Sequence, residues 1–227
     1  NPHHSIIVKD LSWYELTGLL FGINNPVPEY YENARKSYES REYDDAILMF
    51  NKVVNATPKY YNYPNRLKSA AQDFHNESLI FLAQTFVMLD SLDRAIDLYR
   101  QVYDNNRDLY CINKVLRLLY LKEEYMKAIK LSSKMIDGEL RDNGRFQYSL
   151  NAKWSFGITN EEYDPYIIRA LCKNHLEDYR GCIKDYTHVV NTYIETEGKD
   201  PNPNGLFMKP AGVFIELALA HYKIEQF

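Results

Sequence analysis

The fold is decided by one stretch near the start of the chain, Tyr43-Asp44-Asp45-Ala46-Ile47-Leu48-Met49-Phe50-Asn51-Lys52-Val53-Val54, which is followed by Pro58. Ala46, Phe50 and Val53 are spaced i, i+4 and i+7, and this spacing places one apolar stripe along a helix. The small side chain of Ala46 lets a neighbouring helix approach closely, and Phe50 fills the space one turn further on. Pro58 marks the end of the helix, because proline cannot continue it.

A first helix precedes this stretch. Tyr30, Ala34 and Tyr38 recur every four residues, and the short connection Ser40-Arg41-Glu42 joins them to the second helix. The two helices form a hairpin that is apolar on one side. Such a hairpin needs a neighbouring unit to cover its apolar side.

The hairpin pattern recurs three more times along the chain. The small residues of the second helices are Ala46, Ala95, Ala128 and Cys182, in steps of 49, 33 and 54 residues. Against a repeat period of about 34 residues, the first and last steps contain insertions. The small residues of the first helices are Ala34, Ala83 and Ala170, each twelve residues before its counterpart. Because two markers keep one register, we predict an array of helical hairpins.

These residues resemble the tetratricopeptide repeat family. The family pattern has a large apolar residue at repeat position 4, small residues at positions 8 and 20, an aromatic residue at position 24 and proline at position 32. The first copy matches this pattern at Tyr30, Ala34, Ala46, Phe50 and Pro58. Later copies depart from it: Leu116 takes a small position, Ser132 takes an aromatic position, and Lys173 lies where an apolar residue is expected.

The resemblance implies an all-α fold, a right-handed superhelical solenoid of antiparallel helix pairs with four repeats and a terminal half repeat. We expect residues 1–26 to form an N-terminal segment with a capping helix, and residues 27–227 to form the solenoid. The expected repeats are 27–60, 76–109, 109–142, 163–196 and the half repeat 211–227, with insertions at 59–75, 139–162 and 197–210. The second half of the first insertion is predicted to lengthen the helix that follows it. Asn143-Gly144 in the second insertion is typical of a β-hairpin turn.

Composition narrows the classes of function. The chain of 227 residues has 27 basic and 31 acidic residues, and its net charge is −4. This balance argues against non-specific binding to nucleic acid, which requires a basic face. No apolar run approaches the ~18–20 residues that span a bilayer. The first residues do not resemble a signal peptide, so we expect a cytoplasmic protein; an exported protein that has lost its signal is the alternative.

The sequence contains no catalytic motif that we can identify. It has no glycine-rich phosphate loop, no GxSxG and no HExxH, and its six histidines are scattered. The three cysteines, Cys111, Cys172 and Cys182, form no disulfide framework and no CxxC motif. Packing is the expected role of Cys182, and a redox pair with Cys172 is the alternative. We therefore expect no enzyme activity, no bound metal and no cofactor.

The resemblance also implies where a partner binds, because in this family the partner usually lies in a concave groove lined by the first helices. The groove positions are occupied here by Tyr31, Arg35, Tyr38, Gln84, Asn113, Arg117, Tyr120 and Asn174. Arginine can pair with a carboxylate through two hydrogen bonds, and tyrosine supplies contact area at low entropic cost. A short extended peptide with acidic and apolar residues would suit such a groove. Arg35, Gln84 and Arg117 replace the asparagines with which some members grip a C-terminal carboxylate, so we do not predict that ligand.

Three functions therefore stay open at this point. The first is a scaffold that binds a protein or peptide in the groove. The second is the sensor or regulatory part of a larger polypeptide whose catalytic or effector domain is not in this chain. The third is an exported helical-repeat protein that binds a glycan or another small ligand. The partner and the oligomeric state are not determined by the sequence.

Overall fold

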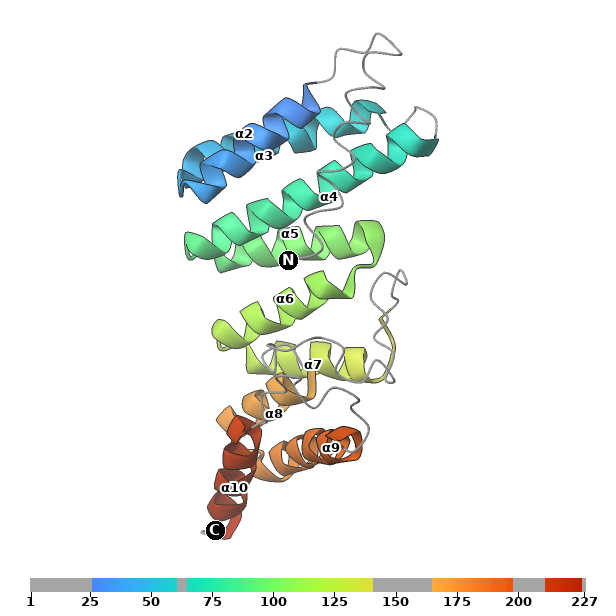
Figure 1. Ribbon diagram of the computed structural model, residues 1–227. Coiled ribbons are helices and arrows are strands. Elements are labelled where there is room, and N and C mark those ends of the chain that lie inside the picture. The colour runs from blue at the N-terminus through green and yellow to red at the C-terminus, as the bar shows by residue number, and fades with distance from the viewer. Residues whose placement is uncertain (1–25, 61–64, 141–164, 198–210, 226–227) are drawn as a thin grey trace. The chain divides into compact units, whose positions relative to one another are not determined.

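The computed structural model describes residues 26–60, 65–140, 165–197 and 211–225, and these form helices with no strand among them (Figure 1). The predicted all-α fold of antiparallel helix pairs is confirmed. The expected capping helix before residue 26 and the expected β-hairpin at Asn143-Gly144 lie outside the described residues. The chain divides into two compact units, Asn1–Asn105 and Asn106–Phe227.

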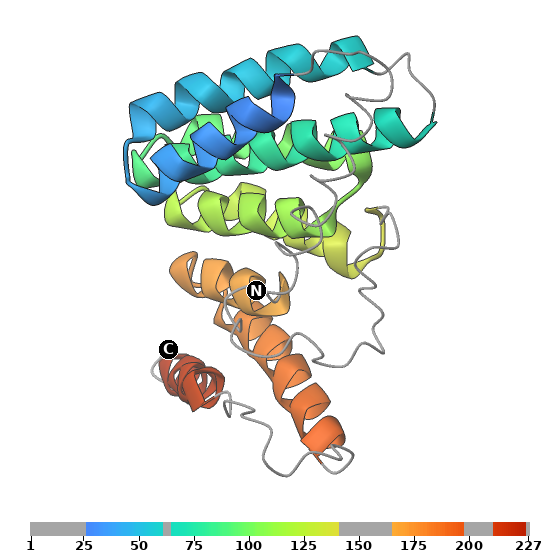
Figure 2. The same cartoon turned by 45° about the horizontal axis from the view of Figure 1, so that its top comes forward.

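The first unit contains two helical hairpins (Figure 2). Its elements are α2 (Val27–Glu39), α3 (Tyr43–Ala56), the short 3-10 helix η1 (Thr57–Tyr60), α4 (Asn65–Met88) and α5 (Leu92–Asn106). Helix α4 has 24 residues because it begins within the first insertion, as the sequence predicted. Ala71 and Phe74 in this added part are buried, at 0% and 4% exposure. The insertion therefore extends the apolar stripe of the second repeat.

Aromatic rings form the core of the first unit. Phe50 of α3 stacks on Phe81 of α4, with ring centroids 5.1 Å apart. Tyr31 of α2 contacts both rings edge-on, at 6.1 Å and 6.3 Å, and also contacts Phe74 at 5.1 Å. Edge-to-face and offset pairs of this kind stabilise beyond the area they bury, by about 0.5–1.5 kcal/mol each. The first hairpin is thus fixed to the second by rings from three helices.

The second unit contains two hairpins and a last single helix. Its elements are α6 (Leu109–Leu121), α7 (Tyr125–Ile136), α8 (Pro165–His175), α9 (Tyr179–Glu197) and α10 (Ala211–Glu225). Helix α10 packs against α9 through Val213 and Ala220, which join the core around Ala170, Cys182 and Tyr186. The unit therefore ends in a first helix that has no second helix of its own among the described residues. No described helix is long and apolar enough to cross a membrane.

The small residues that set the repeat register are packing residues. Each of them has 0% exposure: Ala34, Ala46, Ala83, Ala95, Ala128, Ala170 and Cys182. Phe50 and Val53, which complete the opening stripe, are also fully buried. These burial values confirm the predicted role of the stripe, because helices approach closely only where a side chain is small.

Each hairpin turns at the same point of the repeat. One residue of each turn has a left-handed backbone: Arg41 (φ 64°), Asp90 (φ 55°), Glu123 (φ 60°) and Glu177 (φ 61°). This residue comes five positions before the small residue of the second helix. The N–H of the residue after it donates to a carbonyl five residues back, as from Glu42 to Ser37 at 2.8 Å and from Asp178 to Lys173 at 2.9 Å. This pattern is a Schellman helix end, which usually carries glycine.

Candidate functional site

Four of the predicted partner-binding residues lie in the first unit. Tyr31 has only 1% exposure and belongs to the aromatic core, so the prediction that it contacts a partner is corrected. The reason is geometric: on α2, Tyr31 faces α3 and α4, and its ring fills the space between Phe50, Phe74 and Phe81.

The phenol of Tyr31 is held by a carboxylate within the core. It is hydrogen-bonded to the side chain of Glu77 on α4. Burial raises the pKa of Tyr31, and the nearby charge of Glu77 raises it further. Burial likewise raises the pKa of Glu77, although the bond to Tyr31 and the charge of Arg35 act in the opposite direction. Tyr31 and Glu77 therefore form an internal polar contact between two first helices.

The other three predicted residues of the first unit are half-buried. Arg35 forms an ion pair with Glu39 one turn later, at 3.2 Å, and its side chain is 25% exposed. Tyr38 packs against Tyr43 and Phe81, with ring centroids 6.2 Å and 5.4 Å away. Gln84 is half-buried on α4. These three residues remain candidates for contact with a partner.

In the second unit, Asn113 is buried on α6. It has 4% exposure, and its Oδ1 atom has no hydrogen-bond partner among the described residues. The prediction that Asn113 lies on an open surface is therefore corrected. Arg117, one turn further along α6, is half-buried and remains a candidate.

The structure places the last two predicted site residues, Tyr120 and Asn174, in one group with two further residues. Tyr120 of α6, Asn174 and His175 of α8 and Lys223 of α10 lie at the C-terminal ends of three successive first helices, and we call these four residues the first-helix cluster. The hydroxyl of Tyr120 lies 3.3 Å from Nε2 of His175. The Nζ of Lys223 donates to Oδ1 of Asn174 at 3.1 Å.

Aromatic rings surround this cluster. The imidazole of His175 stacks on Tyr125 at the start of α7, with ring centroids 4.6 Å apart. The ammonium group of Lys223 lies 5.1 Å from the ring centroid of Tyr179. Burial and the nearby phenol of Tyr125 raise the pKa of Tyr120, so its phenol stays protonated at neutral pH. The cluster thus combines an ammonium, an amide, a hydroxyl and an imidazole group, and flat apolar rings lie beside them.

Such a set of groups can recognise a carboxylate next to an apolar side chain. The ammonium of Lys223 and the amide of Asn174 are hydrogen-bond donors for oxygen. Tyr120 and Tyr125 supply area that loses little conformational entropy on binding. His175 and Asn174 are half-buried or exposed, and so is Lys223, so a ligand can reach the cluster.

Lys223 was not among the predicted site residues, although it occupies the same repeat position as His175, which the family pattern places in the groove. Both lie at repeat position 13 when the fourth repeat is counted from residue 163 and the half repeat from residue 211. Had the groove positions of the family pattern also been assigned in the half repeat, they would have included Lys223. No sequence signal indicates the stacking of His175 on Tyr125, because it joins residues of two different repeats.

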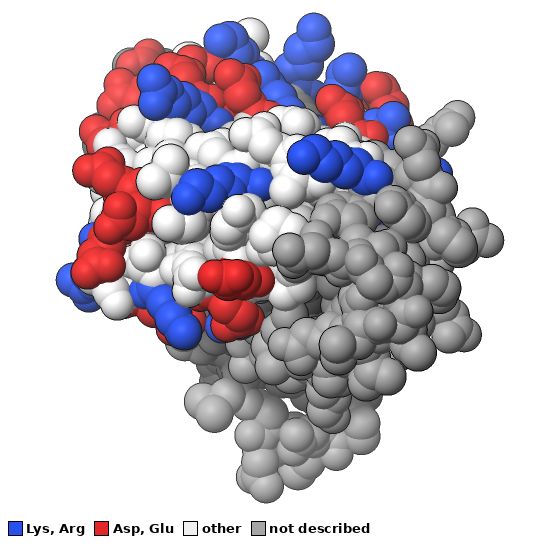
Figure 3. Space-filling model, turned by 90° about the horizontal axis from the view of Figure 1, so that it is seen from above, with Lys and Arg blue, Asp and Glu red and all other residues white. Residues whose placement is uncertain are grey.

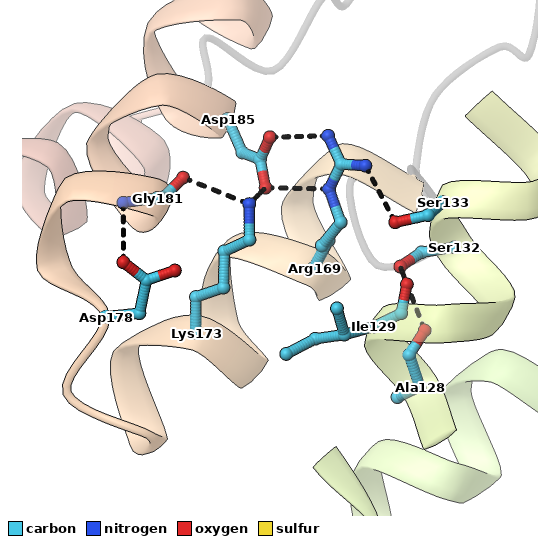
Figure 4. Close-up of polar contacts among 9 residues, drawn as sticks. All are labelled: Ala128, Ile129, Ser132, Ser133, Arg169, Lys173, Asp178, Gly181 and Asp185. Atoms are coloured by element: carbon cyan, nitrogen blue, oxygen red, sulfur yellow. Dashed lines mark hydrogen bonds and ion pairs between the residues drawn. The ribbon is translucent and has the colours of Figure 1, made fainter. Parts of the chain in front are cut away.

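A second polar group, shown in Figure 4, lies inside the fourth repeat. Arg169 of α8 donates to Asp185 of α9 through Nε at 2.8 Å and through Nη2 at 2.6 Å. Lys173 donates to the same carboxylate at 2.8 Å, and Nη1 of Arg169 donates to Ser133 of α7 at 3.0 Å. The side chain of Asp185 is 2% exposed, and those of Arg169 and Lys173 are 15% and 16% exposed.

This group explains one departure from the repeat pattern. Lys173 takes an apolar position because the buried carboxylate of Asp185 pairs with it. Ser132, which takes an aromatic position in the third repeat, lies outside this group, and its hydroxyl donates to the carbonyls of Ala128 and Ile129 in its own helix, each at 2.9 Å. We assign the Arg169–Asp185–Lys173 group to the packing of α7, α8 and α9, since every polar contact shown there is internal.

Charge on the first unit is unevenly distributed. Figure 3 shows uncharged surface with a few Lys and Arg side chains, and Asp and Glu side chains gathered along one side of this face. The exposed acidic residues at the α2–α3 turn are Glu39, Glu42, Asp44 and Asp45. A surface of this sign repels phosphate.

The cysteines are buried thiols. Cys111, Cys172 and Cys182 each have 0% exposure and are free. Burial raises the pKa of Cys172 and Cys182 to about 12, so both stay protonated at neutral pH. A protonated thiol is a poor nucleophile and a poor metal ligand. In the part of the chain that the structure describes, no group of three or more His, Cys, Asp or Glu side chains could hold a metal ion.

Comparison with known proteins supports the fold. No family model matches the sequence, and no curated protein matches it. Among solved structures, the chain is similar to the crystal structure of MamA protein, with a TM-score of 0.52 and 16% identity over 90% of this chain and 97% of that one. A second structure, the MamA RS-1 ArsTM double mutant, has a TM-score of 0.49 and 10% identity over 90% of this chain and 99% of that one. The first of these likenesses supports a helical-repeat solenoid fold for this chain.

Proposed function

We propose that this chain is a non-catalytic interaction scaffold of the tetratricopeptide repeat type, which holds a short peptide on the exposed sides of its first helices. The first-helix cluster carries this proposal. It gathers polar and aromatic groups from the same end of α6, α8 and α10, although nearly 50 residues or more separate Tyr120, Asn174 and Lys223 in the sequence. Packing alone does not require these groups, since Lys223 and Asn174 are polar and accessible.

The chemistry of the cluster favours a peptide that is both acidic and apolar. An Asp, a Glu or a terminal carboxylate would accept hydrogen bonds from Lys223 and Asn174. An apolar side chain beside it would pack on Tyr120 and Tyr125. The proposal includes no nucleic acid, because the net charge of −4 and the acidic side of the first unit disfavour a polyanion.

The proposal can be tested by selecting peptides from a random library on the purified chain and measuring their affinity by fluorescence polarisation. We expect acidic and apolar sequences to be enriched. Asn174→Ala and Lys223→Ala should each weaken the selected peptides about tenfold, which corresponds to the loss of one good contact. Lys130→Ala is the matched control, because Lys130 is an exposed cation on the second helix α7 and should leave affinity unchanged.

If the double variant Asn174→Ala/Lys223→Ala binds every selected peptide as the unchanged chain does, the first-helix cluster is not the peptide site. The pair Arg35→Ala and Arg117→Ala then tests the two predicted arginines in the same assay. Binding that is lost only in this pair would show that the arginines, and not the first-helix cluster, contact the peptide.

A further inference from the structure

The last helix, α10, exposes an apolar face. Four large side chains on it are well exposed: Phe214 (41%), Ile215 (60%), Leu219 (47%) and Tyr222 (59%). Ala218 lies among them and is also exposed. A contiguous exposed apolar surface of this kind marks an interaction site.

This face is distinct from the one that packs on α9. Val213 and Ala220 are buried at 4% and 2% exposure, and Leu217 packs beside them. At 3.6 residues per turn, Ala218 and Tyr222 lie on nearly the opposite side of the helix from Val213 and Ala220. Helix α10 is therefore apolar on two opposite sides, as expected for a helix that packs against a neighbour on each of them.

The repeat register indicates what covers the second side. Ala218 is at repeat position 8 of the half repeat, the position of Ala34, Ala83 and Ala170. In the complete hairpins these alanines are fully buried beside a second helix that also has a small residue, followed four positions later by a ring: Ala46 and Phe50, Ala95 and Tyr99, and Cys182 and Tyr186. The face of α10 thus fits an antiparallel helix with a small residue and an aromatic residue at spacing i, i+4.

One described helix has this pattern on an exposed side, and it is α10 itself. Ala218 and Tyr222 have the spacing i, i+4, and both are exposed, whereas the same pattern is buried in α3, α5 and α9. We propose that α10 packs antiparallel against α10 of a second copy of this chain, about a two-fold axis at Ala218.

The arrangement is self-complementary. In an antiparallel pair centred on residue 218, Phe214 lies opposite Tyr222 of the second copy, and Tyr222 lies opposite Phe214 of the second copy. The two Ala218 residues meet at the axis, where their size lets the helices approach. Glu225 lies opposite Ala211 of the second copy, the first residue of its helix. A carboxylate is favourable at that end because the helix dipole is positive there. Such a two-fold contact is isologous, so it closes as a dimer.

The first test is the oligomeric state in solution. Because one pair of helices buries less than a standard interface of about 1,600 Å², we expect a weak dimer, with Kd on the order of micromolar to tens of micromolar by sedimentation. Ala218→Lys should raise Kd more than about 100-fold, since two ammonium groups would meet at the axis. Lysine is a good helix former, and an unchanged circular dichroism spectrum would show that the variant folds.

Met126→Lys is the matched control, because Met126 is 68% exposed on α7 and its replacement also adds a cation in place of an apolar side chain. It should leave the dimer intact. A chain that stays monomeric at millimolar concentration, or a dimer that Ala218→Lys leaves unchanged, would overturn the proposal. A monomeric chain whose α10 binds a helix of another protein would overturn it as well.

The second test reports the direction of the helices. Ala218→Cys should form a disulfide-linked dimer under mild oxidation, because the two residues meet at the axis, whereas the three native cysteines are buried. Glu225→Cys should not, because an antiparallel pair separates the two residues at position 225 by roughly 20 Å. Rapid cross-linking at position 225 and not at position 218 would contradict the antiparallel arrangement.

Discussion

Asp185 accepts hydrogen bonds from two cations inside the fourth repeat, and this contact shows how a single residue can hold a hairpin together. Its carboxylate binds Nε and Nη2 of Arg169 and Nζ of Lys173, all within 2.8 Å. The bond to Asp185 and its negative charge raise the pKa of Arg169 against the opposing effect of burial. Removing one partner of a buried ion pair costs more than the pair itself contributes, because the remaining charges stay buried.

We predict that Asp185→Asn lowers the free energy of unfolding by about 3–5 kcal/mol. The reason is that Arg169 and Lys173 would keep their charges and lose the carboxylate. Urea denaturation followed by circular dichroism measures the change. Asp97→Asn is the control, because Asp97 is exposed on α5, and its effect should stay within about 0.5 kcal/mol.

The combination Arg169→Met, Lys173→Met and Asp185→Leu should recover most of the lost stability, because apolar residues of similar volume can replace a buried ion group. A loss below about 1 kcal/mol in Asp185→Asn alone would show instead that water reaches the two cations.

At the scale of elements, the hairpin turns are the part of the repeat that carries strain. Arg41, Asp90, Glu123 and Glu177 all have positive φ, between 55° and 64°. This conformation is unfavourable for residues with a Cβ atom, and glycine adopts it without that cost. The repeat keeps the turn because the Schellman hydrogen bonds satisfy the carbonyls at the end of the first helix.

Glycine at the turn should therefore stabilise the first hairpin. We expect Arg41→Gly to raise the free energy of unfolding by about 0.5–1 kcal/mol, since relief of the positive φ exceeds the extra flexibility of the unfolded chain. Thermal unfolding gives the measurement. Glu42→Gly should give no gain, because φ of Glu42 is −82° and has no such strain. Equal effects of the two changes would show that the turn geometry is not the cause.

At the scale of the whole chain, one register of small residues connects all the hairpins. Position 8 of the repeat is fully buried at Ala34, Ala83 and Ala170, and it is exposed at Ala218. The same residue type at the same position thus has opposite environments, because only α10 lacks a second helix among the described residues.

This difference in burial predicts that replacing alanine with leucine has different effects on stability at two of these positions. Ala83→Leu should destabilise the chain by about 1–3 kcal/mol, because the extra atoms have no room between the helices. Ala218→Leu should change stability by less than about 0.5 kcal/mol, because the side chain extends into solvent. Urea denaturation at low protein concentration keeps the chain monomeric and allows the comparison. Similar losses at both positions would contradict the register at the half repeat.

The sequence by itself determined the register, and with it the helices. Ala46, Phe50 and Val53 predicted their own burial, and the extension of α4 to Asn65 was confirmed, because amphipathic spacing and small residues act locally along one helix. The predicted partner-binding residues other than Tyr31 and Asn113 stay predictions. Tyr31 and Asn113 occupy groove positions of the family pattern but are buried here, because the rings around Tyr31 come from helices far along the chain.

Only the tertiary structure decided which residues meet. Lys173 lies where the repeat pattern predicts an apolar residue, and the structure shows that it pairs with Asp185. Tyr120, Asn174 and Lys223 became one cluster because three first helices end side by side. The exposed side of α10 likewise followed from packing, since the residues of that helix are apolar on both sides and their spacing does not say which side is covered. Periodicity fixes which residues share a helix face, whereas contacts between repeats depend on packing that no single helix encodes.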